Sequence, residues 1–416
     1  MLTKPMMDMF LKEYWTQLQQ DTNALENHPF LGMCPKDTDG GGEYVVIPLD
    51  VDDGAEGSPN FAVAQQIAAA TSSIKNQFMV QWTEDFQLAQ ISNQIIRLSR
   101  NVPKLALESA KRETKRARRI LANRLARCLY RSGYGEKGTL DGVTGVATAT
   151  ATLANRADIR NFHIGDAITF SATLGSALRD GGDFVSVIGI DYDNHSLLTD
   201  APVSLAASIA GIGAGDTIYG LGQRLAGALP ATQQLQGLAS WIPTVAPVLG
   251  VPFCGVDRAV WTDRYAGLRY TTGVGPVDEI LIDALIFAAQ NESYPTHLFI
   301  CGSKWGELIK SLEGRYEKVI EQAWEAKVGY RGIQIGVGYG ANDIKIFPDP
   351  DCPDGLAYAV KMSSCKLVSA GELIQNDLQG QEVVQMGAAS AIEYRYVTTA
   401  AFGIDAPKHN MVIVLP

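Results

Sequence analysis

The sequence predicts an α+β protein with a long basic helix, an extended hairpin and a small inserted β-domain. Three observations lead to this fold class. An apolar stripe at helical spacing continues for about 28 residues, or roughly 42 Å of helix. Two strand-like runs flank a long, weakly apolar segment, and between residues 139 and 220 short strands alternate with turn signals. Of the 416 residues, 46% are hydrophobic and 19% charged, which is typical of a globular protein.

Residues 1–37 begin with a mixed helical pattern around Tyr14-Trp15 and end in loop signals at His28-Pro29 and Cys34-Pro35. Aromatic residues on so short an element favour an arm that packs onto another surface. An ordinary N-terminal helix on its own domain is an equal alternative.

The runs Glu43–Leu49 and Gln77–Trp82 predict the two strands of a hairpin that extends over residues 38–92. A lone two-stranded ribbon is marginally stable in water, so we expect this hairpin to pack on another chain. The residues expected at that contact are Tyr44, Val46, Phe61, Phe78 and Trp82.

A helix is predicted from Asn101, a suitable cap, to Ser132-Gly133, a stop signal. Between Arg97 and Arg131 there are 12 basic and two acidic residues, whereas the whole chain has a net charge of −10. Basic side chains neutralise nucleic-acid phosphates without reading base sequence. The residues expected to face DNA are Lys111, Arg112, Lys115, Arg116, Arg119 and Arg127. A solvated face, or pairing with acidic groups elsewhere, is an equal alternative.

Residues 139–220 contain nine aspartates, three arginines, and neither lysine nor glutamate. The recurring Gly-Asp turns and short apolar runs predict an inserted β-barrel or sandwich. After Pro243 the pattern becomes α+β again, with a helix at Val277–Ala289, a strand at Leu298–Cys301 and several strands in the last eighty residues.

The sequence offers no catalytic, cofactor or metal site. The six cysteines show no CxxC spacing and no HExxH occurs. The glycine-rich run 336–340 joins two predicted strands, which indicates a turn rather than a phosphate loop. Asp349, Asp351 and Asp354 alternate with prolines, and we interpret them as turn residues rather than as a calcium site. No apolar run approaches the roughly 20 residues of a membrane helix.

Three further stretches resemble those of a known protein family. They are Gly237–Pro243, Pro295–Ser303 and Ile344–Tyr358, the last of which contains a Cys-Pro-x-Gly…Tyr pattern. Their order, together with the hairpin and the basic helix, resembles the major capsid proteins of tailed bacteriophages with the HK97 fold. The resemblance implies the following parts: an N-terminal arm (1–37), an E-loop hairpin (38–92), a P-domain spine helix (93–138), an inserted β-domain (139–220), mainly A-domain (221–370), and closing P-domain strands that return to the A-domain (371–416).

This resemblance implies a structural protein rather than an enzyme. Its subunits would form the hexamers and pentamers of an icosahedral shell around double-stranded DNA, and the shell would assemble in the host bacterial cytoplasm and become part of the virion. The main alternative is an encapsulin-like compartment for cargo protein. An enzyme with an inserted β-domain and a DNA-binding protein outside any shell are the rival classes.

The same resemblance leads to expectations about partners. Few residues precede the hairpin, so we expect a separate scaffolding protein and no maturation cleavage, with a portal as a further partner. Whether a decoration protein binds is left open. No membrane contact is expected. Lys75 and Asn76 lie on the hairpin, but no motif identifies a covalent cross-link, and we expect none.

Overall fold

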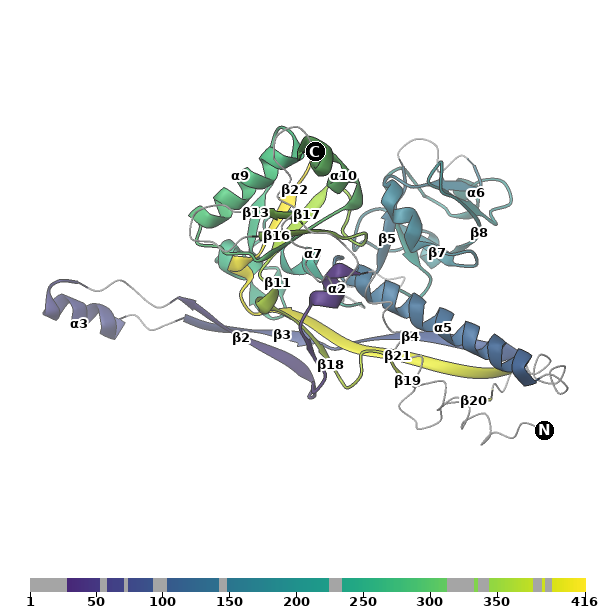
Figure 1. The fold of residues 1–416 in the computed structure, drawn as a ribbon, viewed down its shortest axis with the longest axis horizontal. Helices are drawn as coiled ribbons and strands as arrows, with labels where there is room; N and C mark the ends of the chain where they lie inside the picture. The colour runs from purple at the N-terminus through teal and green to yellow at the C-terminus, as the bar shows by residue number, and fades with distance from the viewer. Residues whose placement is uncertain are drawn as a thin grey trace.

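The computed structural model describes residues 28–52, 58–70, 74–92, 103–141, 148–223, 234–312, 333–335, 344–376, 384–385 and 391–416. Within these residues the chain has a body, an inserted domain and a projecting hairpin (Figure 1). The helical pattern around Tyr14-Trp15 lies outside them. None of the helices described combines the length and apolarity that a membrane span requires.

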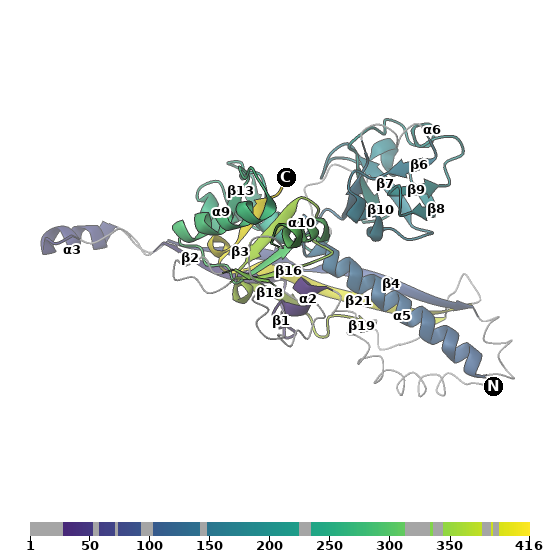
Figure 2. The same cartoon turned by 45° about the horizontal axis from the view of Figure 1, so that its top comes forward.

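The predicted hairpin is formed by β2 (Tyr44–Asp52) and β3 (Ile74–Gln81), which pair with Val46 opposite Met79. At its far end lies α3 (Phe61–Ala70), well away from the body in both views (Figures 1 and 2). The sequence analysis missed this helix. The Asn60 side chain caps its start by accepting a hydrogen bond from the Ala62 amide at 3.0 Å, and the alanine-rich run then favours the helix.

A long sheet forms the base of the body. Strand β4 (Thr83–Ser92) pairs along its length with β21 (Ala391–Ile404), so residues 83–92 belong to this sheet and not to the hairpin's own sheet. The other strands of this sheet are β1 (Lys36–Asp37), β18 (Cys365–Ser369), β19 (Gln375–Asn376) and β20 (Val384–Gln385).

The long helix predicted from the apolar stripe is α5 (Pro103–Cys128). It lies across β4 and β21, where Ala117 and Leu121 pack against Ile91, Tyr394 and Tyr396. Arg124 fixes this arrangement, because its guanidinium pairs with Asp85 and donates to Gln87 Oε1 of β4 at 3.0 Å.

The inserted domain is a sheet of order β5-β10-β7-β8-β9-β6 around its own apolar core. It begins at Glu136, slightly before the predicted boundary. Its strands are β5 (Glu136–Thr139), β6 (Thr150–Thr152), β7 (Ala167–Ser171), β8 (Val185–Asp191), β9 (Ser196–Thr199) and β10 (Thr217–Gly220). They are accompanied by the 3-10 helices η3 (Arg156–Asn161) and η4 (Arg179–Gly182) and by α6 (Leu205–Ser208).

The upper half of the body contains a mixed sheet of order β13-β22-β17-β14-β16-β15. Its strands are β13 (Leu268–Tyr270), β14 (His297–Ile300), β15 (Ile333–Ile335), β16 (Ile344–Pro348), β17 (Leu356–Val360) and β22 (Met411–Val414). Helices α9 (Val277–Gln290) and α10 (Gly302–Leu312) cover the face on which Leu298 and Ile300 lie, while Phe299 points to the main core. The sequence analysis predicted most of these elements.

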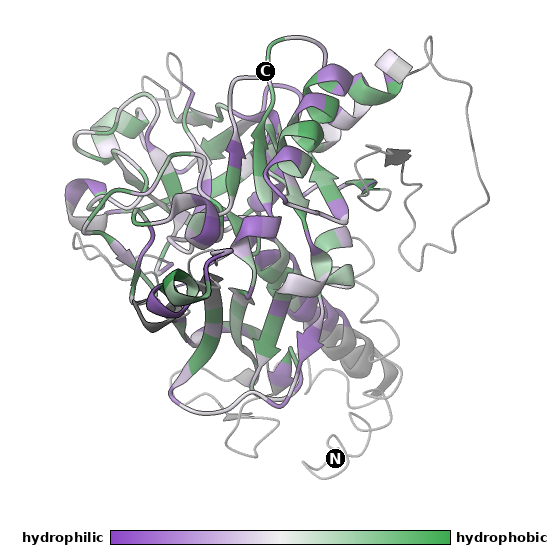
Figure 3. Ribbon diagram, turned by 90° about the vertical axis from the view of Figure 1, so that its left-hand side faces the viewer, coloured by the Kyte–Doolittle hydropathy of each residue, from purple (hydrophilic) through white to green (hydrophobic). Residues whose placement is uncertain are grey.

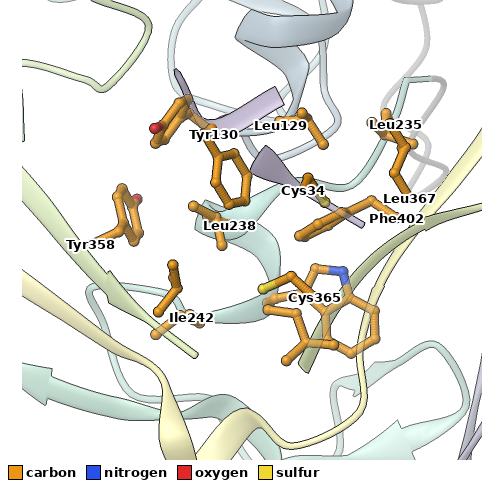
Figure 4. Packing of buried hydrophobic residues seen from close by; sticks show 14 of the residues in the cluster. Cys34, Leu129, Tyr130, Leu235, Leu238, Ile242, Tyr358, Cys365, Leu367 and Phe402 are labelled. Carbon is orange, nitrogen blue, oxygen red and sulfur yellow. The ribbon is translucent and has the colours of Figure 1, made fainter. Parts of the chain in front are cut away.

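Short elements complete the body: α2 (Pro29–Met33), α7 (Leu238–Trp241), α8 (Thr262–Ala266), β11 (Pro252–Phe253), β12 (Val256–Asp257), η5 (Met362–Ser364) and η6 (Pro407–His409). Hydrophobic residues are frequent on the central strands, whereas hydrophilic ones are common on the helices and loops around them (Figure 3). Figure 4 shows how side chains from distant segments, including Cys34, Tyr130, Leu238 and Phe402, converge in the main core. This core joins the base sheet to the upper half of the body.

Candidate functional site

The base of the hairpin has one face in the core and one in solvent. Because side chains alternate along a strand, Phe78 and Val80 are buried while their neighbour Met79 is 43% exposed. Tyr44 and Val46 on β2 lie on the same outward face as Met79. This face, which we call the hairpin outer face, is an apolar surface that the described part of the chain leaves largely exposed.

Of the five predicted contact residues, Phe78 is not available to a neighbour and Trp82 is only partly exposed. Phe78 is 0% exposed and packs edge-on against Trp241 with ring centroids 5.0 Å apart. Trp82 is half-buried, and its indole N–H donates to the Gly42 carbonyl at 3.0 Å. Phe78 in particular is a core residue of its own chain.

Helix α3 carries exposed apolar side chains. Phe61 is 78% exposed, Val63 is also exposed, and the helix contains no charged residue. An apolar helix held away from the body is expected to bury its surface against another molecule.

The exposed cations of α5 form one row. Arg112, Lys115, Arg116 and Arg119 are spaced i, i+3, i+4 and i+7, so they share the helix face opposite to the sheet. The row is about 10 Å long at 1.5 Å per residue. Arg116 also lies 3.7 Å from Glu113. The side chain of Lys111 lies outside the described residues.

The remaining arginines of α5 have structural roles. Arg127 is 6% exposed, so it does not belong to the exposed row, and burial lowers the pKa of its guanidinium. Arg118 is buried with its guanidinium 5.8 Å from the ring centroid of Tyr396. Arg118 and Arg124 thus link the helix to β21 and β4 of the base sheet.

The aspartates of the proline-rich loop are committed to bonds within the chain. Asp349 and Asp351 are buried and bonded to His28, Tyr130 and Arg160, while Asp354 bonds to Ser303. Within the described part of the chain, no group of histidine, cysteine and acidic residues is arranged to hold a metal ion. The six cysteines are free thiols.

No protein-family model and no curated protein matches the chain. Among solved structures, a chain from the capsid asymmetric unit of cyanophage A-1(L) superimposes with a TM-score of 0.51 at 10% sequence identity. The alignment covers 93% of this chain and 92% of that chain. The chain has an HK97-like fold.

Other structures superimpose less closely. A chain described as Mycobacterium phage Bobi has 9% identity and a TM-score of 0.42, with 94% of this chain and 91% of that chain covered. The holo-SrpI encapsulin of Synechococcus elongatus PCC 7942 has 9% identity and a TM-score of 0.41, with coverages of 92% and 86%.

Several exposed apolar residues of this HK97-like chain escaped the sequence analysis. Phe86 and Leu88 are exposed on β4, and Met79 and Val63 lie on the hairpin. The signal for β4 was weak, because Phe86 and Leu88 on its exposed face and Ala89 and Ile91 on its buried face are all apolar and break the alternation expected of a half-buried strand.

Proposed function

We propose that this protein is the major subunit of an icosahedral shell and that its assembly depends on the hairpin. The observation that carries the proposal is the HK97-like fold over nearly the whole chain, shared with a phage capsid chain. The exposed apolar helix α3 and the hairpin outer face support it, because they provide apolar surfaces that are exposed in the described part of the chain. Repeated symmetric contacts close such a shell.

We further propose that the shell encloses double-stranded DNA of a tailed phage and belongs to the virion. The exposed cation row on α5 supports this choice, since phosphate neutralisation needs exposed basic groups and no base-specific contacts. In this proposal the parts named from the resemblance keep their roles: arm (1–37), hairpin (38–92), spine helix (93–138), surface insertion (139–220), A-domain (221–370) and closing strands (371–416). A scaffolding protein and a portal would be its assembly partners, and its role is structural rather than catalytic.

The first experiment is to express the chain with its neighbouring genes and measure particle size by sedimentation and electron microscopy. Uniform closed particles tens of nanometres across would support the shell function. A stable monomer or small oligomer would contradict it.

Particle content then separates the two kinds of shell. Particles that protect double-stranded DNA from nuclease support the phage proposal. Particles that contain a specific protein and no DNA would overturn it in favour of an encapsulin-like compartment.

A further inference from the structure

Three segments that are distant in sequence meet at the carboxylate of Asp351: its own loop, the N-terminal segment and the inserted domain. One of its oxygens accepts a hydrogen bond from Arg160 Nη2 at 2.7 Å, and Arg160 lies on η3 of the inserted domain. The other oxygen pairs with His28 Nδ1 at the start of the N-terminal segment 28–34. The Asp351 and His28 side chains are 4% and 5% exposed, so their bond is shielded from bulk water, whereas the Arg160 side chain is 35% exposed.

Asp349 extends this joint into the body. Its carboxylate accepts hydrogen bonds from the Phe30 amide at 3.0 Å, the Tyr130 hydroxyl at 2.8 Å and the Asp351 amide at 2.9 Å. The joint therefore contains two buried carboxylates two residues apart, and a proton on Asp349 relieves their repulsion.

His28 is placed to carry a charge. Its Nδ1 faces Asp351, and its Nε2 lies 3.0 Å from the side-chain oxygen of Asn123 on α5. A neutral imidazole has one N–H donor, whereas an imidazolium has two, so both acceptors are satisfied when His28 is protonated.

A second ion pair attaches the inserted domain independently. Asp158, also on η3, pairs with Arg131 just beyond the end of α5. The inserted domain therefore carries an acid and a base on η3. Asp158 pairs with Arg131 of the body, and Arg160 pairs with Asp351 of the body. Because of this second attachment, loss of the Arg160 bond alone would loosen η3 without detaching the domain.

We propose that Asp351 couples the attachment of the N-terminal segment 28–34 to the docking of the inserted domain, and that proton uptake at this joint tightens both. The groups that face His28 and Asp349 are Asp351 and Tyr130, with Cys352 and Arg160 next to them. The pKa values of Tyr130 and Cys352 are held well above their usual range by burial, so these two groups stay neutral near pH 7.

The direction of the pH effect follows from the pKa shifts of Asp349 and His28. Burial and the neighbouring charge of Asp351 raise the pKa of Asp349 to about 6. Burial alone would lower the pKa of His28, but its bonds to Asp351 and Asn123 outweigh this and raise it above 6.5. A group whose pKa is raised by folding stabilises the structure below its unfolded pKa, and this contribution disappears as the pH rises through the folded pKa. The joint is therefore tighter at about pH 5.5 than at about pH 7.5.

Hydrogen exchange of the full-length, unassembled chain tests this proposal and does not require shell formation. Exchange is measured by mass spectrometry at about pH 5.5 and about pH 7.5, after correction for the intrinsic pH dependence of amide exchange. Peptides from 28–34 and from η3 are compared with a reference from α9. Protection of both segments, relative to α9, should be severalfold higher at the lower pH, since one unit of pKa difference corresponds to about tenfold.

Two variants separate coupling from simple packing. In His28→Gln, exchange should rise at η3 as well as at 28–34, although His28 bonds to Asp351 and Asn123 and not to η3. In Asp349→Asn, which keeps the side-chain shape but cannot titrate, the pH response of both segments should be smaller than in the wild type. The proposal is overturned if the wild-type segments respond to pH no more than α9 does, or if His28→Gln affects residues 28–34 alone.

Discussion

Gly237 lies directly against the carbonyl group of Cys128, the last residue of α5. A Cβ atom on residue 237 would come within 2.2 Å of that oxygen and 2.3 Å of the Leu129 oxygen. The amides of Gly237 and Leu238 donate to the carbonyls of Arg131 and Leu129 at 3.0 and 2.7 Å. The turn into α7 thus satisfies backbone groups left unpaired at the end of the long helix.

Gly237→Ala should therefore destabilise the chain. The atoms that a methyl group would meet are backbone atoms, which cannot move aside, so we expect a loss near the upper end of the overpacking range, about 3 kcal/mol. Urea unfolding of the soluble chain measures this loss. Gly306→Ala is the matched control: Gly306 is inside α10 with open space around it, and the substitution should stabilise by about 0.5–1 kcal/mol. Equal stability of the two variants would contradict the proposed packing of α7 on α5.

Substitutions on the buried and the exposed face of the hairpin should differ in their effect on the free energy of unfolding. Phe78→Ala removes a ring packed against Trp241 and Phe253, and the free energy of unfolding should fall by about 3–5 kcal/mol. Val46→Ser on the exposed face should change it by less than about 0.5 kcal/mol. If the hairpin outer face is an assembly contact, Val46→Ser should nevertheless lower the yield of particles. Normal assembly of that variant would argue against the contact.

Much of this fold follows from local sequence patterns. The stripe that includes Ala117 and Leu121 predicted α5, and two apolar runs predicted the hairpin, because both periodicities are set by backbone geometry. The same patterns did not show that Phe78 is a core residue, since burial on one strand depends on Trp241, which is distant in sequence. Helix α3 was missed because small residues give a weak periodic signal.

Arg127 shows that local patterns also fail to reveal burial by distant elements at the candidate site. On a helical wheel it falls beside the exposed row formed by Arg112 and Arg116. In the structure the last turn of α5 enters the body close to the charged groups Glu136 and Lys137 of β5, and Arg127 is buried there. The sequence shows which residues share a helix face, but it does not show where another element covers that face.

The cation row can be tested by neutralisation. In the triple variant Arg112→Gln, Arg116→Gln and Arg119→Gln, the dependence of DNA affinity on salt should weaken by about one phosphate contact per residue removed. The measurement is binding of the chain to a double-stranded fragment across a salt series, together with the DNA content of particles. A control with equal charge change at exposed residues elsewhere combines Lys310→Gln, Lys366→Gln and Arg156→Gln. Similar effects of the two triple variants would show that net charge, and not the row, determines binding.

His297 should lower the stability of the upper half of the body in acid. This is the opposite of the effect expected of His28, because folding lowers the pKa of His297 and raises that of His28. Its ring stacks with Phe299 and Phe347 at centroid distances of 6.4 and 5.9 Å. Burial, together with the positive charge of Lys345, lowers its pKa to about 4. Folding therefore opposes its protonation, so its contribution to stability is present above the unfolded value of 6.5 and is lost as the pH falls towards 4.

His297→Phe should reduce that loss, because a phenyl ring keeps the stacking and cannot take up a proton. The free energy of unfolding, measured at several pH values between about 6.5 and 4, should decline less steeply in this variant than in the wild type. His28→Gln provides the contrast: the stabilisation from a histidine whose pKa is raised by folding is lost as the pH rises above 6.5, so this variant should weaken the pH dependence on the alkaline side of 6.5 and leave the acid decline nearly unchanged. If His28→Gln reduces the acid decline as His297→Phe does, the opposite charge preferences inferred for these two histidines are wrong.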